Sequence, residues 1–268
     1  MSVIDLDCGS LLRVDGRRGF GHITVRDATN LAVERAIAHG VAAVAVHNCD
    51  YAGRFADFCE AAAAAGVATV MFVNDAGAGQ VVAPPGGREG RMSTNPVAAG
   101  IPRAGSPHLV IDMATSTVAM GRLSEWRDRG EETPAGWLNE HGVLQFFAGA
   151  KGFGLALIAE ALGGALTSAG TVSSRPADDR QGALIIAIHV DGLRPLQEFT
   201  DEVEAFTRYV KDTPVGDGTP PVRVPGEGSA ATTEARRTHG VPIQRFTWQV
   251  MTGLGDRFQV TLPARQPK

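Results

Sequence analysis

The hydrophobic and polar positions of the first third of the chain predict strands and helices in alternation. Apolar residues recur at helical spacing over residues 27–39, with Asp27 as the predicted cap and Gly40 as the stop. Short apolar runs at 41–46 and 67–73 predict buried strands, and an alanine-rich helix is predicted between them at 55–65. We predict a single strand within residues 1–13 and a turn or loop in the glycine-rich segment 14–21.

The second half of the chain continues this mixed pattern. Residues 124–142 form a polar segment. An apolar helix is predicted at 155–166, and a strand is predicted after it at 183–190. An amphipathic helix at 195–211 has Pro195 in its first turn, which fits a helix start. Two more helices are predicted at 232–238 and 243–254, and the tail after Arg257 is predicted to be an extra strand or disordered.

The alternation invites the prediction of a dinucleotide-binding Rossmann unit, but the glycines argue against it. Gly77 and Gly79 follow the strand at 67–73, and a Rossmann fingerprint then needs a third small residue and a helix. That position holds Val82, and Pro84 and Pro85 follow it. Because proline removes a backbone donor and clashes inside a helix, this segment cannot open the required helix. We therefore predict an α/β protein without a standard Rossmann site.

Composition excludes several classes of function. The chain has 268 residues, is 44% hydrophobic and 20% charged, and carries a net charge of -4, so it can bury a large core and is not expected to bind nucleic acid. No apolar stretch approaches the ~18 residues of a membrane span, and the N-terminus lacks the features of a signal peptide. Cys8, Cys49 and Cys59 lack metal-ligand spacing and read as reduced thiols, so we expect a cytoplasmic protein without a metal.

Three polar or glycine-rich segments are candidates for binding. Residues 93–96 read Ser-Thr-Asn-Pro and residues 112–116 read Asp-Met-Ala-Thr-Ser, and each lies beside an apolar run, which suits hydrogen-bonding groups at the rim of a sheet. The segment 149–154, Gly-Ala-Lys-Gly-Phe-Gly, opens the apolar helix. A lysine at a helix start favours an anion such as a pyrophosphate. Ordinary loops, and a helix start with a solvated lysine, are the alternatives.

Together, in this order, the three segments resemble the type-2 malate/L-lactate dehydrogenase family, whose members are NAD(P)-dependent reductases of 2-oxo acids and cyclic imino acids and ureidoglycolate dehydrogenases. The resemblance runs from about Val14 to Trp248. It implies the fold of that family, an α/β (α+β) protein with a large mixed sheet, flanking helices and a non-Rossmann cofactor site. It also implies NADH or NADPH as cofactor and a homodimer.

The resemblance assigns residues and domains. The residues assigned to the cofactor are Ser93, Thr94, Asn95, Asp112, Thr115, Ser116, Lys151, Gly152 and Gly154. We divide the chain into an α/β cofactor-binding core, residues 1–123 and 181–226, and a helical part, residues 124–180 and 227–268, which is shortened relative to the family.

The residues expected to contact the substrate differ from those of the family. The family has a catalytic histidine in an Asn-Ser-x-His-x-Gly motif, and the matching segment 48–53 has Cys49 for the serine and Tyr51 for the histidine. A family Ser-His-Gly motif would precede the point where this chain begins to match. Because tyrosines titrate near ~10 and histidines near ~6.5, a tyrosine is the poorer proton donor at neutral pH. We assign the catalytic role to Tyr51, Asp50 and His47, each with a structural or solvent-exposed alternative.

Two functions fit these observations. The first is an NAD(P)H-dependent reductase of a small 2-oxo or cyclic imino acid, for which a specialised biosynthetic pathway is one setting. The alternative is a descendant that has lost redox chemistry and catalyses a cyclisation or isomerisation, or only binds a ligand. Hydride transfer needs a nicotinamide, a group that orients the substrate and a proton donor. We favour the reductase because all three cofactor segments are present.

Overall fold

The computed structural model describes residues 2–77, 79–173 and 180–263. The chain separates into two compact units, Met1–Gly226 and Glu227–Lys268. None of the described helices combines the length and the apolar character needed to cross a membrane. The predicted division into a core and a helical part built from 124–180 with 227–268 stays a prediction.

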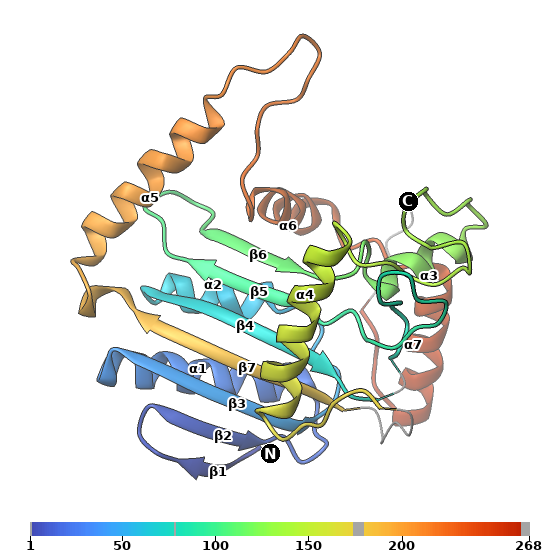
Figure 1. Cartoon of the computed structure of the whole chain (residues 1–268), viewed down its shortest axis with the longest axis horizontal. Helices are drawn as coiled ribbons and strands as arrows, with labels where there is room; N and C mark the ends of the chain where they lie inside the picture. Colours follow the sequence, from blue (N-terminus) through green and yellow to red (C-terminus); the bar gives the residue numbers. More distant parts are fainter. Residues whose placement is uncertain (1, 78, 174–179, 264–268) are drawn as a thin grey trace. The chain divides into compact units, whose positions relative to one another are not determined.

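Seven strands form one mixed sheet in the first unit, in the order β1-β2-β3-β7-β4-β5-β6 (Figure 1). Their bounds are β1 Val3–Asp7, β2 Leu11–Asp15, β3 Val41–Cys49, β4 Val67–Asp75, β5 Val97–Ile101, β6 Leu109–Met113 and β7 Gln181–His189. β2 pairs with β3 in parallel, whereas the other neighbouring strands are antiparallel. This mixed order confirms the prediction of a large mixed sheet that is not a Rossmann sheet.

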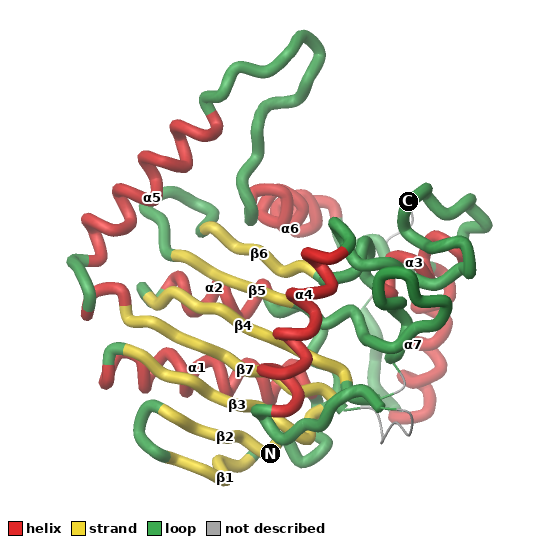
Figure 2. The backbone as a smooth tube through the Cα atoms, viewed as in Figure 1, coloured by secondary structure: helices red, strands yellow, loops and turns green. Residues whose placement is uncertain are grey.

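Helices lie on both faces of the sheet. α1 (Gly21–His39) and α2 (Ala56–Ala64) lie behind it in the view of Figure 2, and α4 (Ala150–Ala159) crosses its near face. In β3 the buried residues Ala42, Val44 and Val46 alternate with less buried ones, as expected where one face of a strand packs on a helix. The main core is therefore the layer between the sheet and the two far helices.

A second, smaller core supports the loops at one edge of the sheet. Its buried members are Val82, Met92, Val118, Leu123, Leu144, Phe146 and Ala156. They come from the loops on either side of β5 and β6, from α3 (Met120–Asp128) and from α4. Close packing of these side chains fixes the conformation of the irregular segments, including the loops that carry the candidate site.

The predictions for the first 39 residues were partly wrong. Residues 1–13 contain a strand, a turn and most of a second strand, because Gly9, at φ 78, turns the chain and its N–H donates to Asp7. α1 begins at Gly21, six positions before the predicted cap Asp27, which instead pairs with Arg26 on the surface. The glycine that suggested a loop is the first residue of the helix, because only a residue without a side chain fits there.

The helix predicted at 155–166 is two elements. α4 ends at Ala159, and a π-helical turn, η1 (Glu160–Ala165), follows it. Gly163 and Gly164 in this turn lie against β4, where an added Cβ would come within 2.9 Å of the Phe72 carbonyl oxygen and 2.3 Å of the Asn74 amide nitrogen. The close approach of helix and strand, which only glycine allows, accounts for the widened turn.

The remaining helices correspond to the predictions with shifted ends. α5 (Leu196–Lys211) confirms the amphipathic helix, and the second unit has α6 (Glu227–His239) and α7 (Arg245–Phe258). α3 was missed, because its polar surface leaves Leu123 as its buried residue and gives no apolar stripe. No strand follows α7 in residues 259–263, and residues 264–268 of the predicted tail lie outside the described residues.

Candidate active site

The predicted residues lie along one edge of the sheet, the edge formed by the ends of the strands and not by an outer strand. β2, β3, β4 and β6 run in the same direction and end at this edge, where β5 and β7 begin. The loops after β3 and β6 and the segment before β5 therefore lie along one rim, although they are far apart in sequence. This is the arrangement that the polar loops at the strand ends predicted.

The residues assigned to catalysis separate into two environments. His47 is still within β3, opposite Asp15 on β2, and its ring nitrogen lies 3.1 Å from a carboxylate oxygen of Asp5 on β1. Burial alone would raise the pKa of Asp5, but hydrogen bonds from Arg13 and His47 together hold it below its ordinary value. His47 is thus engaged in the sheet and stands apart from the other two residues.

Asp50 and Tyr51 lie in the loop after β3. The Asp50 carboxylate is 3.7 Å from the guanidinium of Arg18, and both side chains are about half exposed. Tyr51 is 69% exposed, and its hydroxyl has no hydrogen-bond partner within the described part of the chain. The neighbouring Cys49 is a buried free thiol, and burial, followed by the charge of Asp50, raises its pKa to about 12.

The residues that pack against this loop were not among those predicted from the sequence. The His22 ring meets the Tyr51 ring edge-on with centroids 6.4 Å apart, and it stacks on Phe20 at 4.9 Å. Phe20 is 65% exposed. We call Phe20, His22, Asp50 and Tyr51 the edge cluster. The signal in the sequence was a histidine directly after the glycine-rich segment, which the analysis treated as a loop.

Ser93, Thr94 and Asn95 form the entry to β5 and are largely enclosed. Asn95 is fully buried with a φ of 29°, and its side-chain amide donates to the Ala156 carbonyl at 3.1 Å and to Glu160 at 2.7 Å. Ser93 is 6% exposed. The amide nitrogen of Asn95 therefore attaches the sheet to α4 and η1 and is not available to a ligand in this arrangement.

Asp112, Thr115 and Ser116 are also engaged with the protein. Asp112 accepts hydrogen bonds from the backbone N–H groups of Phe55 at 2.7 Å and Ala56 at 3.0 Å, so it caps α2. Thr115 donates from its hydroxyl to the carbonyl of Thr94 at 2.9 Å, and Ser116 donates to Val118 at 2.8 Å. These contacts give each of the three side chains a structural role, whatever else it contacts.

Glu160 completes a buried polar group that the sequence did not reveal. Its carboxylate accepts from Asn95, from Asn74 at 3.4 Å and from the Val172 N–H at 2.7 Å. We call Asn74, Asn95, Thr115 and Glu160 the buried polar seam, because each is at most 7% exposed. The seam joins β4, the segment before β5, the segment after β6 and η1.

Lys151 opens α4 with its side chain exposed and with no ion pair to any described residue. The N–H groups of Lys151 and Gly152 already donate to the carbonyls of Ala148 and Phe147. These two backbone donors are therefore not free to bind an anion. A Cβ at Gly152 would lie 2.2 Å from the Phe147 carbonyl oxygen, whereas Gly154 has open space around it. The lysine ammonium is the part of this segment most suited to an anion.

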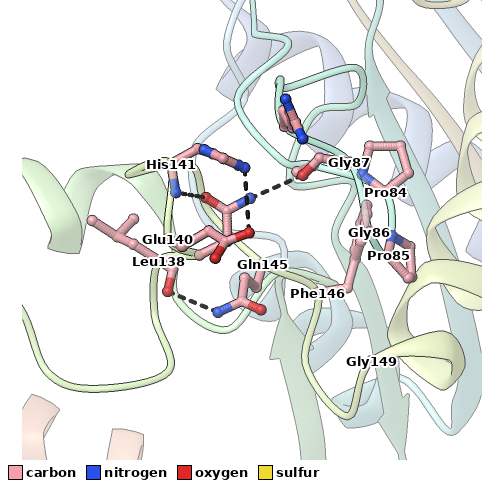
Figure 3. A pocket seen from close by; sticks show the side chains of 13 residues that line it. Pro84, Pro85, Gly86, Gly87, Leu138, Glu140, His141, Gln145, Phe146 and Gly149 are labelled. Carbon is pink, nitrogen blue, oxygen red and sulfur yellow. Dashed lines mark hydrogen bonds and ion pairs between the residues drawn. The ribbon is translucent and has the colours of Figure 1, made fainter.

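A pocket of about 600 Å³ lies beside the start of α4 (Figure 3). Its lining comes from residues 83–88, residues 138–141 and Gln145, Phe146 and Gly149. Asn139 connects the two loops, because its amide donates to the Gly87 carbonyl at 3.1 Å and its oxygen accepts from the His141 N–H at 2.9 Å. The cavity has the size of a small-molecule site.

The lining of the pocket contains none of the residues assigned to the cofactor, but two backbone hydrogen bonds join its neighbourhood to one of the predicted segments. The Phe147 N–H donates to the Thr115 carbonyl at 3.0 Å, and the Thr117 N–H donates to the Gln145 carbonyl at 2.8 Å. Arg88 on the wall has no ion pair among the described residues, and His141 pairs with Glu140 at 3.4 Å. In the described ranges, no three His, Cys, Asp or Glu side chains gather as metal ligands. The wall therefore offers cationic and amide groups to a polar ligand.

Comparison with known sequences gives one family for nearly the whole chain. Residues 2–252 match the family model described as malate/L-lactate dehydrogenase. The chain is 34% identical over 280 residues to the L-lactate dehydrogenase of Cupriavidus necator, with 96% of this chain and 79% of the relative covered. It is 32% identical to hydroxycarboxylate dehydrogenase B of Escherichia coli K12, with 91% and 73% covered.

Solved structures agree with the sequence match. A putative malate/lactate dehydrogenase from E. coli superposes with a TM-score of 0.87 at 31% identity, with 98% of this chain and 78% of that chain covered. The malate dehydrogenase of Entamoeba histolytica gives 0.89 at 25% identity, with 98% and 81% covered. The fold, the matched length and the identities together place this chain in the malate/L-lactate dehydrogenase family of oxidoreductases.

Proposed function

We propose that the protein is an NAD(P)H-dependent reductase of a small 2-oxo acid or cyclic imino acid. The observation that carries this proposal is the pocket whose walls pair with residues 115–117 and end at the start of α4. Three relatives support the substrate class by their names, which are L-lactate dehydrogenase, hydroxycarboxylate dehydrogenase B and Δ1-pyrroline-2-carboxylate reductase 1. The last, from Burkholderia ambifaria, is 34% identical over 179 residues.

The bound nicotinamide would supply the hydride, and the protein would hold it and orient the substrate. Arg88 lines the pocket, and Lys151 follows two residues after Gly149, which also lines it, so both cations suit the phosphates of a dinucleotide. We assign the segments 93–95 and 112–116 to the floor of the site. The contacts within the buried polar seam hold these segments in place, so their backbone and their accessible atoms are the groups that remain for the cofactor.

The substrate side of the proposed site is the rim after β3. Reduction of a carbonyl or imine needs a positioned proton donor, and Tyr51, Asp50 and His47 are the residues assigned from the sequence. Arg18 beside Asp50 adds a guanidinium at this rim, the kind of group that orients a carboxylate.

Binding and turnover test the proposal separately. NADH or NADPH at ~100 times its dissociation constant should add roughly 2.7 kcal/mol to the free energy of unfolding, visible as a raised melting temperature. A panel of 2-oxo acids and cyclic imino acids should then oxidise the bound cofactor, followed by its absorbance. Absence of a melting shift with either cofactor would refute the cofactor assignment. Binding without turnover on the panel would favour a non-redox step.

We also propose that the protein is a cytoplasmic homodimer. Leu157, Ile158 and Leu166 on α4 and just after η1 are 46%, 51% and 60% exposed, and Phe206 and Tyr209 on α5 are 50% and 81% exposed. Apolar residues gathered on an exposed helix face favour a partner. Light scattering at micromolar concentration should give twice the mass of one chain, and Ile158→Glu should lower it. A monomeric mass for the unmodified protein would contradict the proposal.

A further inference from the structure

His22 is held against the rim loop that carries Tyr51. Its ring meets the Tyr51 ring at 6.4 Å with an interplanar angle of 76°. A Cβ added to Gly53, at φ 73, would lie 2.2 Å from the Nε2 atom of His22. The loop can therefore pass this ring only because residue 53 has no side chain, which places the imidazole in direct contact with the loop.

The start of α1 fixes the histidine from the other side. Gly21 lies so close to the loop that an added Cβ would be 2.1 Å from the Asp50 carbonyl oxygen. Phe20 stacks on the His22 ring at 4.9 Å with an interplanar angle of 21°. The ring thus has an aromatic neighbour on one face, another at its edge and backbone beside Nε2, and this packing limits its rotamers.

The other histidines of the chain are placed differently. His39, His108 and His189 lie at the opposite edge of the sheet, where β3 and β6 begin and β7 ends. His47 is engaged with Asp5, and His141 pairs with Glu140. His239 belongs to the second unit. At the rim that carries the candidate site, His22 is the histidine with no charged or hydrogen-bonded partner among the described residues.

His22 is also close to a residue assigned to the cofactor. Gly53 contacts the His22 ring, and the backbone N–H of Phe55, two residues later, donates to Asp112 at 2.7 Å. Two residues of extended chain span at most about 7 Å. The imidazole therefore lies a short distance from the end of β6, where the predicted cofactor segment begins.

We propose that His22 gives the proton that substrate reduction consumes; this rests on the proposed function. A bound reduced nicotinamide would supply the hydride to the carbonyl or imine carbon and would itself be oxidised. The substrate oxygen or nitrogen takes a proton from a ring nitrogen of protonated His22, and solvent returns it. Imidazole is the side chain whose charge ordinarily changes near neutral pH. His22 and Tyr51 are both exposed and have no hydrogen-bond partner among the described residues, so the type of side chain separates them, whereas Asp50 faces Arg18.

Three variants test this assignment by turnover. His22→Asn removes the imidazole ring but keeps a small polar side chain, and Tyr51→Phe keeps the ring that packs on His22. His39→Asn, at the other end of the same helix, is the matched control. We expect kcat to fall about 10²- to 10⁴-fold in His22→Asn, at least tenfold more than in Tyr51→Phe, and to stay unchanged in His39→Asn. The reverse order of His22→Asn and Tyr51→Phe would overturn the inference and make Tyr51 the donor.

A second readout does not depend on turnover. Oxamate and pyrrole-2-carboxylate resemble the two substrate classes but are not reduced. In the ring-proton NMR spectrum, one of them should shift the His22 signals, identified by their loss in His22→Asn, and leave the His39 signals in place. Unmoved His22 signals in a protein that binds NAD(P)H and turns over a substrate would overturn the inference alone. Failure of the unmodified protein to bind either cofactor would overturn the proposed function and this inference with it.

Discussion

The buried polar seam and the edge cluster are both polar regions at one edge of the same sheet, but they differ in what their side chains do. In the seam, Glu160 accepts three hydrogen bonds and Asn95 donates two, all within the protein. In the edge cluster, Tyr51 and Phe20 are more than 60% exposed, and His22 contacts aromatic rings and backbone. The seam is suited to hold the site in shape, and the edge cluster is suited to meet a substrate.

The difference shows why a family motif is not the same as a ligand contact. Asn95, Asp112 and Thr115 belong to the segments that resemble the family, yet their side chains tie β5, α2 and the segment after β6 together. A buried polar group left without partners costs about 1–3 kcal/mol, so such networks constrain the residue types strongly. Part of the similarity is therefore explained by contacts within the protein.

The largest expected effect comes from breaking the seam. Glu160→Ala removes the acceptor of three donors, and the Val172 N–H loses its partner in the described structure. We expect the free energy of unfolding to fall by about 3–5 kcal/mol in a urea titration. Glu198→Ala, an exposed glutamate on α5, is the control and should change it by less than about 1 kcal/mol. Equal effects of the two variants would refute the structural role of the seam.

A second variant asks whether charge at the start of α4 serves the cofactor. Lys151→Ala removes an ammonium that has no ion pair in the described structure, so stability should change little. Because charge-assisted hydrogen bonds contribute about 1.5–3 kcal/mol, the dissociation constant for NAD(P)H should rise roughly 10- to 100-fold, measured by cofactor fluorescence. Lys211→Ala at the end of α5 is the charge-matched control. An unchanged affinity in Lys151→Ala would mean that the lysine is only solvated.

The smallest expected effect concerns Asp15, the last residue of β2. Hydrogen bonds from the Arg17 N–H and the Asn48 amide hold the pKa of Asp15 below its ordinary value. Because the folded-state pKa is depressed, this stabilisation is present above the unfolded-state value near ~3.9 and is lost as pH falls through the folded-state value. The contribution is below about 1 kcal/mol, since the carboxylate is near the surface.

Asp15→Asn isolates this contribution. The asparagine oxygen can still accept from the Arg17 N–H, but the side chain no longer titrates. Melting temperatures from pH 7 down to 3 should therefore converge for the two proteins at acid pH and differ slightly at neutral pH. A difference that grows as the pH falls would contradict the assignment of the shift.

The sequence by itself determined the class of the fold, the family and most of the elements. Hydrophobic periodicity located the buried strands and the amphipathic α5, and two prolines after Val82 excluded a Rossmann helix, because these signals depend on neighbouring residues alone. The loops after β3 and β6 were predicted from short polar residues that follow apolar runs, although both strands extend further than predicted, to Cys49 and Met113.

Only the tertiary structure decided which side chains meet. The strand order brings β7 between β3 and β4, and no local pattern encodes that pairing. Close packing at Gly21 and Gly53 depends on atoms of distant segments, the Asp50 carbonyl oxygen for Gly21 and the His22 ring for Gly53, so the sequence could not show why these positions hold glycine. Asn95 likewise makes a buried structural contact, and His22 lies against Tyr51. Both contacts join segments that are distant in the sequence, so they form only when the sheet is complete.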